Sequence, residues 1–533
     1  MSAPIAKSPI ASMFVTPLSE QSAKQVAANL GGQAFVYHPR TDHLRTDQLL
    51  DSQPQVVHLG LGGFHRAHQA MVFDALMAGG AGGAGGAGEN NAWQICAVGM
   101  RSDKLAKQLK AQDHLYLVRV SDDSGSRWHA PSSIVKTLVT ASQRDAVIDQ
   151  IANAKTRWVT LTVTEKAYTP ELARLIVDGL AKRQAKGLGG LTIASCDNLP
   201  DNGHVLRALC LEQARTSIAA PGLCDWVQTE CRFPSSMVDG IVPAPSAEVR
   251  EAACADLGLD DPTALGVEAF WEWVIEDAFV DPSDADALRS VGVVVSNDVA
   301  GFEQAKLWML NGSHTVLAGA GAVLGDAYIR QVIARPVMKQ FIHGYMTHAS
   351  GPLVGRPNWQ AYRDALIKRF SNPMLDHGCL QVYSDSSLKI PVRWLPVGER
   401  LLAKRSQDLN QDVNQDLNHE RADDAGLNYL AMAVAIFARS LWPVNQAGDP
   451  FVFNDPLAGE LQVLAKDQHV DPAGAIQALL CQPNMEWAIF GHQLGQDNGF
   501  VQTATHWLAQ IHANGLETSL QRFNQTGARQ QQS

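Results

Sequence analysis

The chain has 533 residues, of which 46% are hydrophobic and 18% are charged. This length is too great for one compact core, and the composition excludes a largely disordered chain, so we expect two or three folded domains. The net charge of −11 argues against a nucleic-acid-binding protein, because no broad positive field is present to displace phosphate counterions.

The sequence predicts a cytoplasmic protein with no membrane partner. Its longest apolar stretches are about ten residues long, whereas a membrane-spanning helix needs about 20. The N-terminus lacks an unbroken apolar segment after basic residues, so we expect no secretory signal. The eight cysteines are scattered and form no CxxC pair, which favours reduced thiols.

Strands and helices are predicted to alternate through about residue 297. A short apolar run at 55–60 enters a glycine turn, and helical spacing follows over 65–77. Further strands are predicted at 93–99, 115–121, 157–164, 191–197, 237–242 and 290–296, and helices at 102–112, 144–154, 170–186 and 204–215. This alternation indicates a parallel sheet with helices on both faces.

From Phe302 onward the pattern changes to helix after helix. We therefore predict an α/β nucleotide-type domain over 51–297 and a mostly α-helical domain over 298–533, with residues 1–50 as an N-terminal extension. Two low-complexity segments, 79–88 (GGAGGAGGAG) and 407–418 (QDLNQDVNQDLN), are predicted to be surface loops, because neither can bury a core.

The turn at 56–66 (VVHLGLGGFHR) reads as a strand, a G-x-G turn and a helix start. Glycines let the backbone pass close to a pyrophosphate, and a helix N-terminus supplies N–H donors. The third small residue of the full fingerprint is missing, because His65 stands there. The acidic candidate, Asp103, lies 43 residues after Gly60. From spacing alone, a cofactor site and a turn without a ligand are equally compatible.

Four polar side chains share one side of the apolar helix predicted over 302–318. Counted at about 100° per residue, they fall within a sector of about 140° and are Glu303, Lys306, Asn311 and His314. Desolvation can lower the pKa of a lysine toward that of a base, and an asparagine can donate N–H bonds to an alkoxide. The alternative is a lysine that reaches solvent beside satisfied core polar groups.

Oxidation of an alcohol with a nicotinamide cofactor needs a base for the hydroxyl proton. The chain has no HExxH or paired-cysteine motif, and no tyrosine is followed by lysine four residues on. A lysine base without a metal is the solution that remains.

The spacing Lys306-x4-Asn311-x2-His314 resembles the catalytic signature of the mannitol dehydrogenase family, the polyol-specific long-chain dehydrogenases. Six further blocks resemble the same family: HLGLGGFHRAHQA (58–70), TVTEKAY (162–168), SCDNLPDNG (195–203), FPSSMVDGIVP (233–243), LNGSH (310–314) and RFSNP (369–373). The resemblance spans residues 55 to about 500. It implies a Rossmann-type dinucleotide-binding domain, a helical catalytic domain and metal-independent hydride transfer.

The resemblance also implies a role for individual residues. Lys306 would be the general base, Asn198 and Asn311 the oxyanion hole, His314 a substrate-orienting group and Glu303 a proton-relay carboxylate. The turn that contains Gly60, Gly62, Gly63, Phe64 and Arg66 would hold the pyrophosphate, and Val238 and Asp239 would approach the nicotinamide. Lys389 matches the family's substrate-binding lysine.

Three positions depart from the mannitol enzymes. Gly240 stands where the family usually has arginine, Gln381 replaces an arginine eight residues before Lys389, and residues 164–168 read TEKAY instead of TEGGY. The last two resemble the fructuronate reductase (mannonate oxidoreductase) branch, which also has an arginine near Arg393. A hexuronate carboxylate can pair with added basic groups, so Lys166, Lys389 and Arg393 are predicted to bind substrate. A solvated Lys166 and a hexitol substrate such as mannitol stay open.

NAD is the expected cofactor, because Asp103 can hold the ribose hydroxyls. Arg101 and Lys104 beside it leave NADP possible. We expect a small sugar acid or polyol as substrate and no metal, and the oligomeric state, monomer included, is open. A different class, a non-catalytic nucleotide-binding protein on the same fold, would have no need of the four residues Asn198, Lys306, Asn311 and His314 together.

Overall fold

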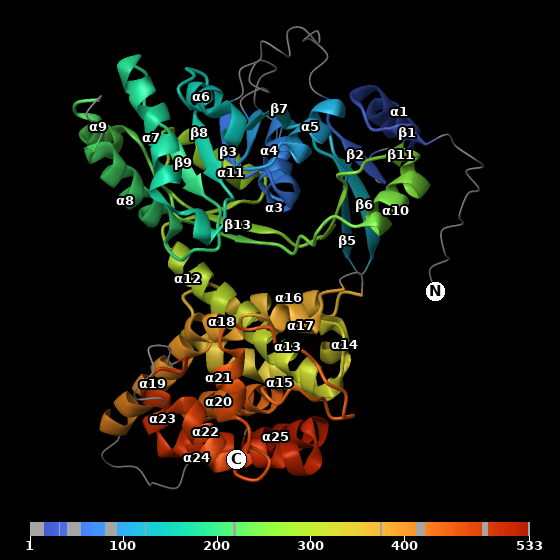
Figure 1. Cartoon of the computed structure of the whole chain (residues 1–533), viewed down its shortest axis with the longest axis vertical. Coiled ribbons are helices and arrows are strands. Elements are labelled where there is room, and N and C mark those ends of the chain that lie inside the picture. Colours follow the sequence, from blue (N-terminus) through green and yellow to red (C-terminus); the bar gives the residue numbers. More distant parts are fainter. Residues whose placement is uncertain are drawn as a thin grey trace. The chain divides into compact units, whose positions relative to one another are not determined.

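The computed structural model describes residues 15–30, 32, 34–39, 55–79, 93–122, 124–216, 220–373, 376–411, 422–481 and 489–530. The chain divides into two compact units, Met1–Val299 (unit 1) and Ala300–Ser533 (unit 2) (Figure 1). Most of the two predicted low-complexity loops lies outside the described residues. Residues 407–411 differ from the prediction, because helix α19 (Leu395–Gln411) continues through them.

A five-stranded parallel sheet forms the centre of unit 1. Its strands are β3 (Val56–Leu59), β4 (Ile95–Gly99), β7 (Ile134–Val139), β8 (Trp158–Leu161) and β9 (Thr192–Ser195), in the spatial order β7-β4-β3-β8-β9. The first of these five strands in the chain, β3, lies in the middle of the sheet, so the direction of winding reverses between β3 and β8. This is the Rossmann order, and its ligand crevice lies at that switch point, beyond the carboxyl ends of the strands.

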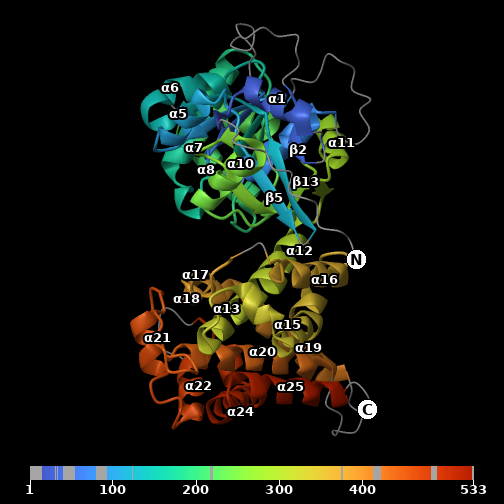
Figure 2. The same ribbon diagram turned by 90° about the vertical axis from the view of Figure 1, so that its right-hand side faces the viewer.

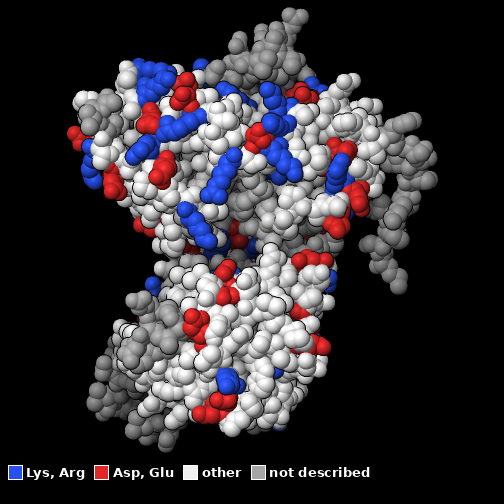
Figure 3. Space-filling view, viewed as in Figure 1, with Lys and Arg blue, Asp and Glu red and all other residues white. Residues whose placement is uncertain are grey.

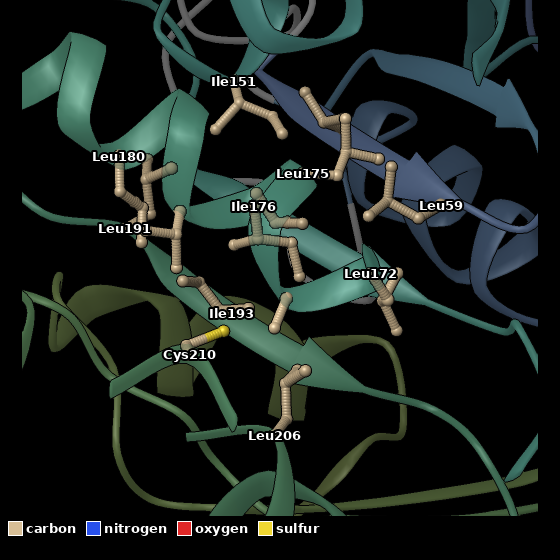
Figure 4. Packing of buried hydrophobic residues seen from close by; sticks show 14 of the residues in the cluster. Leu59, Ile151, Leu172, Leu175, Ile176, Leu180, Leu191, Ile193, Leu206 and Cys210 are labelled. Carbon is tan, nitrogen blue, oxygen red and sulfur yellow. The ribbon is translucent and has the colours of Figure 1, made fainter. Parts of the chain in front are cut away.

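The two faces of this sheet bury different sets of side chains, because successive residues of a strand point to opposite sides. One face packs against α6 (Thr140–Ile151), α7 (Pro170–Ala185) and α8 (Asn202–Arg215). Figure 4 shows this packing, in which Leu175 and Ile176 lie against Leu59 and Ile193. The other face packs against α4 (Gln69–Met77) and α11 (Ser283–Ser290). A parallel sheet covered on both faces is thus confirmed.

Three smaller sheets complete unit 1. The predicted strand at 115–121 is β5 (Val118–Asp122), which belongs to a separate sheet of order β12-β5-β6-β2, with β12 at Leu265–Glu268 and β6 at Gly125–Ala130 (Figure 2). Part of the expected N-terminal extension is built into this unit. β2 (Phe35–Tyr37) pairs with β6, and β1 (Thr16–Pro17) pairs with β11 (Leu259–Asp260).

Among its described residues, unit 2 consists of helices joined by turns and loops, with isolated β-bridges but no longer strand. The apolar helix α13 (Gly312–Leu324) is buried along almost its whole length, and α20 (Ala422–Ser440) packs against α13 and α24 (Asn498–Asn514). Gly312 permits the close approach of Tyr345 to the start of α13, because a Cβ there would lie 2.8 Å from the hydroxyl of Tyr345. The prediction of a Rossmann-type domain followed by a mostly α-helical domain is confirmed. No helix in the described part of the chain is long and apolar enough to cross a membrane.

Candidate active site

The glycine turn that follows β3 is a close-packed junction. Gly60 adopts φ +110°, and a Cβ there would lie 2.2 Å from the carbonyl oxygen of Thr162, the residue after β8. Only glycine fits both the dihedral angle and this approach. The turn then enters the short helix α3 (Gly63–Ala67), and a break at His68 separates it from α4. The single helix predicted over 65–77 is therefore two helices.

The turn opens into a cleft of about 1020 Å³ within unit 1. Gly60, Gly62 and Gly63 contribute backbone to one wall, and the ends of β4 and β8 contribute the others. The residues that line it include one acidic side chain, Glu171, and five basic side chains: Arg66, Arg101, Lys104, Arg144 and Lys166. Basic side chains are also spread over the face of unit 1 seen in Figure 3. The cleft is thus cationic in a chain whose net charge is −11.

Some predicted cofactor residues lie outside the lining of this cleft. Phe64 stacks on His68 with ring centroids 4.9 Å apart and packs into the core. Asp103 directly precedes α5 (Lys104–Ala111) on the surface, where its carboxylate pairs with Lys107 at 2.6 Å. Val238 and Asp239 are buried in β10 (Ser236–Asp239), which pairs with β13 (Glu272–Glu276). None of these four is among the residues that line the cleft in the described part of unit 1.

Arg66 is held in place beneath the cleft. Its guanidinium donates to the carbonyl of Thr263 at 2.6 Å and lies over the ring of Tyr116, whose hydroxyl donates to the carbonyl of Arg66. Burial lowers the pKa of Arg66 from its ordinary value. The side chain is 2% exposed, so it is a fixed charge rather than a mobile one.

Two histidines stack under the same turn. The rings of His58 and His65 lie 3.3 Å apart with 9° between their planes, and both are fully buried. His58 bonds through its two ring nitrogens to Thr160 and Thr162, each at 2.8 Å. Burial lowers the pKa of His58 to about 3 and holds that of His65 well below its usual range. Both rings are therefore neutral at pH 7 and act as packing and hydrogen-bonding groups.

The loop that carries Lys166 is fixed by Asp197. Its carboxylate accepts backbone N–H bonds from Val163 at 3.1 Å and Thr164 at 2.8 Å, and it accepts a third from the hydroxyl of Tyr168. Thr164 has φ +74°, a left-handed conformation that is uncommon for a residue other than glycine. Lys166 follows in a 3-10 turn and lines the cleft of unit 1. Asn198, next to Asp197, is exposed in the turn after β9.

In unit 2, the predicted 302–318 helix contains a segment with a wider winding. Helix α12 (Val299–Gln304) passes into a π-helix, η2 (Ala305–Asn311), and then into α13. In a π-helix each residue bonds to the one five positions on, so residues five apart come closer to one face than in an α-helix. Lys306 and Asn311 are such a pair, and the angle of about 140° expected between them in an α-helix does not apply.

The polar residues of this segment are buried to different extents. Lys306 is 8% exposed and His314 is 7% exposed, whereas Glu303 and Asn311 are half-buried. The ring of His314 lies 4.7 Å from that of Phe370 and 5.4 Å from that of His377. Single-turn π segments occur frequently at functional sites. This is a second reason to regard residues 305–311 as part of a functional site.

Helix α18 (Ser386–Arg393) carries two cations, and one of them bonds to this segment. Arg393 donates to the carbonyl of Asn311 at 3.2 Å and to the hydroxyl of Thr315 at 2.9 Å. Lys389, one helical turn earlier, donates to the carbonyls of Val382 and Ser384. Burial lowers the pKa of Arg393 to about 10. Burial, and then the charge of Arg393, lower the pKa of Lys389.

We call the residues Lys306, Asn311, His314, His377, Lys389 and Arg393 the polar cluster of unit 2. Five of them were candidates from the sequence. His377 was not, because its position in a loop before α17 (Cys379–Tyr383) follows no periodic pattern. Arg144, which lines the cleft of unit 1, was also missed. It lies on α6, a helix that the sequence predicted only as one covering the sheet. No group of three or more potential metal ligands is found among the described residues.

The chain is similar to known proteins over nearly its whole length. Residues 54–285 match the mannitol dehydrogenase Rossmann domain, and residues 298–512 match the mannitol dehydrogenase C-terminal domain. These matches confirm the family identified from the sequence blocks. They also confirm the prediction of a dehydrogenase with a dinucleotide-binding domain.

Individual relatives agree with this assignment. The D-mannonate oxidoreductase of Escherichia coli K12 is 31% identical over 517 residues, which cover 90% of this chain and 96% of that protein. A mannitol 2-dehydrogenase of Aspergillus terreus is 29% identical and covers 88% and 92%. The structure of Pseudomonas fluorescens mannitol 2-dehydrogenase in complex with NAD and D-mannitol has a TM-score of 0.72, 29% identity and coverage of 95% and 99%. The chain therefore belongs to the mannitol dehydrogenase family of oxidoreductases.

Proposed function

We propose that this dehydrogenase interconverts D-fructuronate and D-mannonate with NAD(H), using Lys306 as the general base and no metal. The observation that carries the choice of a sugar acid is the environment of Arg393. The guanidinium donates to a carbonyl and to a hydroxyl, and desolvation lowers its pKa. A half-buried, partly desolvated guanidinium is stabilised by an anion. A substrate carboxylate supplies one, and Lys389 one turn away adds a second positive charge.

The cleft of unit 1 fits a dinucleotide. Its glycine wall lets a pyrophosphate approach the backbone at Gly60, Gly62 and Gly63, and Arg66 offers a fixed positive charge there. NAD, when bound, accepts or returns the hydride of the reacting carbon. Arg101, Lys104 and Lys166 line the same cleft, so we assign Lys166 to the cofactor side rather than to the substrate. We assign Phe64 a packing role against His68, and we assign Asp103 to its surface ion pair with Lys107.

The polar cluster of unit 2 supplies the acid–base chemistry. In the oxidation direction Lys306 takes the proton of the substrate hydroxyl as the C–H hydride leaves, and in reduction it returns that proton to the new alkoxide. Lys306 is 8% exposed, so the proton transfer takes place at a largely desolvated side chain. The amide of Asn311 donates to the developing alkoxide, and Asn198 is retained as the second predicted donor. His314 orients the substrate, and Glu303 relays the proton toward water.

The alternative substrate is a hexitol. Relatives named mannitol 2-dehydrogenase are 29% identical to this chain, and Lys306, Asn311 and His314 would serve a hexitol equally well. The two substrates differ in a carboxylate, so Lys389 and Arg393 are the residues that separate the two candidates.

A substrate panel tests the proposal. The purified chain is assayed at 340 nm with NADH or NADPH against D-fructuronate, another hexuronate, D-fructose and L-sorbose, and in reverse with D-mannonate, D-mannitol and D-sorbitol. We expect the highest kcat/KM for D-fructuronate with NADH. A higher kcat/KM for D-fructose would favour the hexitol alternative, and no turnover of any of these compounds would contradict the proposed activity.

A further inference from the structure

Unit 2 contains a pocket of about 560 Å³ that is separate from the polar cluster. It lies between the end of α20, the start of α22 (Pro472–Leu480) and the last turns of α24, three helices that pack together (Figure 1). No residue of the polar cluster is among the described residues that line it. Small-molecule sites in proteins have volumes of about 300–1,000 Å³, so this pocket is large enough to hold a ring-sized ligand.

Arg439, which is 9% exposed, lines this pocket and presents one side of its guanidinium without a protein partner. Nη1 and Nη2 each donate to the carbonyl of Val444 at 3.1 Å, and Nη1 also donates to the carbonyl of Trp442 at 3.4 Å. A guanidinium carries five N–H donors in one plane. The two that remain, on Nε and on the outer side of Nη2, lie on one edge and have no partner among the described residues.

The charge of Arg439 is not balanced within the pocket. The described residues that line it include no aspartate or glutamate. Asp471 stands next to the lining in the chain, but its carboxylate accepts the backbone N–H of Gly474 and caps the start of α22. Burial lowers the pKa of Arg439, and no carboxylate raises it. Since a buried cation is costly without an anion, a carboxylate or phosphate that enters the pocket stabilises this side chain, and the open edge fits two of its oxygens.

The rest of the pocket wall suits a ring. The ring of Trp442 lies 4.7 Å from that of His469 and 6.1 Å from that of His512. Burial, and then the positive charges of Arg439 and His469, lower the pKa of His512 to about 4, so His512 is neutral at pH 7. The same positive potential that disfavours a proton on His512 favours an anionic ligand. The apolar lining consists of Val444, Val470, Pro472, Ala509 and Ala513.

We propose that this pocket is a second ligand site, for a small organic anion that carries a carboxylate or a phosphate monoester on a ring. The oxyanion accepts the two N–H bonds from the open edge of Arg439, and the ring lies against Trp442 and the apolar lining. Every described residue of this site belongs to unit 2 and lies outside the polar cluster and the cleft of unit 1. The ligand therefore binds whether or not the cofactor is present.

The experiment compares anionic and neutral compounds of nearly the same shape. Isothermal titration calorimetry of the full chain at pH 7.5, with saturating NADH to fill the cleft, uses benzoate, phenyl phosphate and benzamide. We expect at least one of the two anions to bind at least tenfold more tightly than benzamide, and the tighter anion identifies the preferred head group. The titration is repeated with the Arg393→Gln chain, in which the affinity should be unchanged. Equal affinity for all three compounds, or loss of anion binding in Arg393→Gln, would overturn the proposal.

Variants of two residues locate the site. Arg439→Gln removes the charge, so the affinity for the tighter anion should fall at least tenfold, and unchanged affinity in the folded variant would overturn the proposal. Because Arg439 also bonds to the turn after α20, a second pair leaves it in place. Ala513, an exposed residue of the lining, is replaced by glutamate or by lysine.

Ala513→Glu should weaken anion binding at least threefold relative to Ala513→Lys, because the added charges have opposite signs. The matched control is Gln502→Glu, at an exposed position of α24 outside the described lining, which should bind as the wild type does. Circular dichroism identifies any variant that fails to fold. Equal anion affinity of the two folded Ala513 variants would contradict the site.

Discussion

The cleft of unit 1 and the polar cluster of unit 2 are built by different means. The cleft relies on backbone, because Gly60, Gly62 and Gly63 contribute to its wall, and three of its five basic side chains, Arg101, Lys104 and Lys166, are exposed. The polar cluster relies on buried side chains, with Lys306 and His314 below 9% exposure. A backbone site tolerates changes in neighbouring side chains but not in the glycine that permits its shape. A side-chain site has the opposite sensitivity.

The largest effect is expected at Lys306. Replacing it by alanine removes the proposed general base, so kcat should fall by about 10² to 10⁴-fold while the dissociation constant of NADH, measured by fluorescence, stays within twofold. The matched control is Lys339→Ala, an exposed lysine of α15 (Pro336–Gly344), which should keep wild-type kcat. Near-normal turnover of Lys306→Ala would remove the lysine from the acid–base role.

The next prediction concerns Arg393, also in the polar cluster of unit 2. Charged hydrogen bonds contribute about 1.5–3 kcal/mol, so Arg393→Gln should raise the KM for D-fructuronate by about 10- to 100-fold. The KM for D-fructose, which has no carboxylate, should change much less, and Arg393→Lys should recover part of the loss. Equal increases in KM for both ketoses would mean that Arg393 supports the fold of the cluster and does not bind the substrate carboxylate.

The next prediction concerns Gly60, in the backbone wall of the cleft of unit 1. Gly60→Ala forces a Cβ to within 2.2 Å of the Thr162 carbonyl oxygen at φ +110°, so the free energy of unfolding should fall by about 1–3 kcal/mol and NADH should bind more weakly. Gly62→Ala is the control for the stability measurement, since its nearest contact would be 3.6 Å away. Urea titration and NADH fluorescence measure both quantities. Equal stability of the two variants would show that the close approach at Gly60 is unimportant.

The buried histidines give a smaller, pH-dependent effect in unit 1. Burial lowers the pKa of His58 to about 3, so the folded protein keeps this ring neutral where the unfolded chain binds a proton, below about pH 6.5. Its stabilising contribution is present above pH 6.5 and is lost as the pH falls toward 3, at about 1.4 kcal/mol per pH unit. His58→Gln should reduce this slope in urea titrations between pH 6.5 and 4. An unchanged slope would contradict the assignment.

The same contrast explains what could be predicted from the sequence. The strand, glycine turn and parallel order follow from local apolar runs and from glycine, and these features were predicted correctly. The direction of a side chain next to a turn depends on its tertiary partners. Phe64 therefore stacks on His68, and Asp103 pairs with Lys107, instead of lining the cleft. The helical wheel of 302–318 assumed uniform α-helical winding, and the π-helix at 305–311 makes that assumption invalid.

The most direct test of the account is the ratio of kcat/KM for D-fructuronate to kcat/KM for D-fructose, measured with NADH on one preparation of the wild-type chain. Because the half-buried Arg393 lies beside Asn311 without a carboxylate among its hydrogen-bond partners, the account predicts a ratio of at least about tenfold in favour of D-fructuronate. A ratio below one would contradict it.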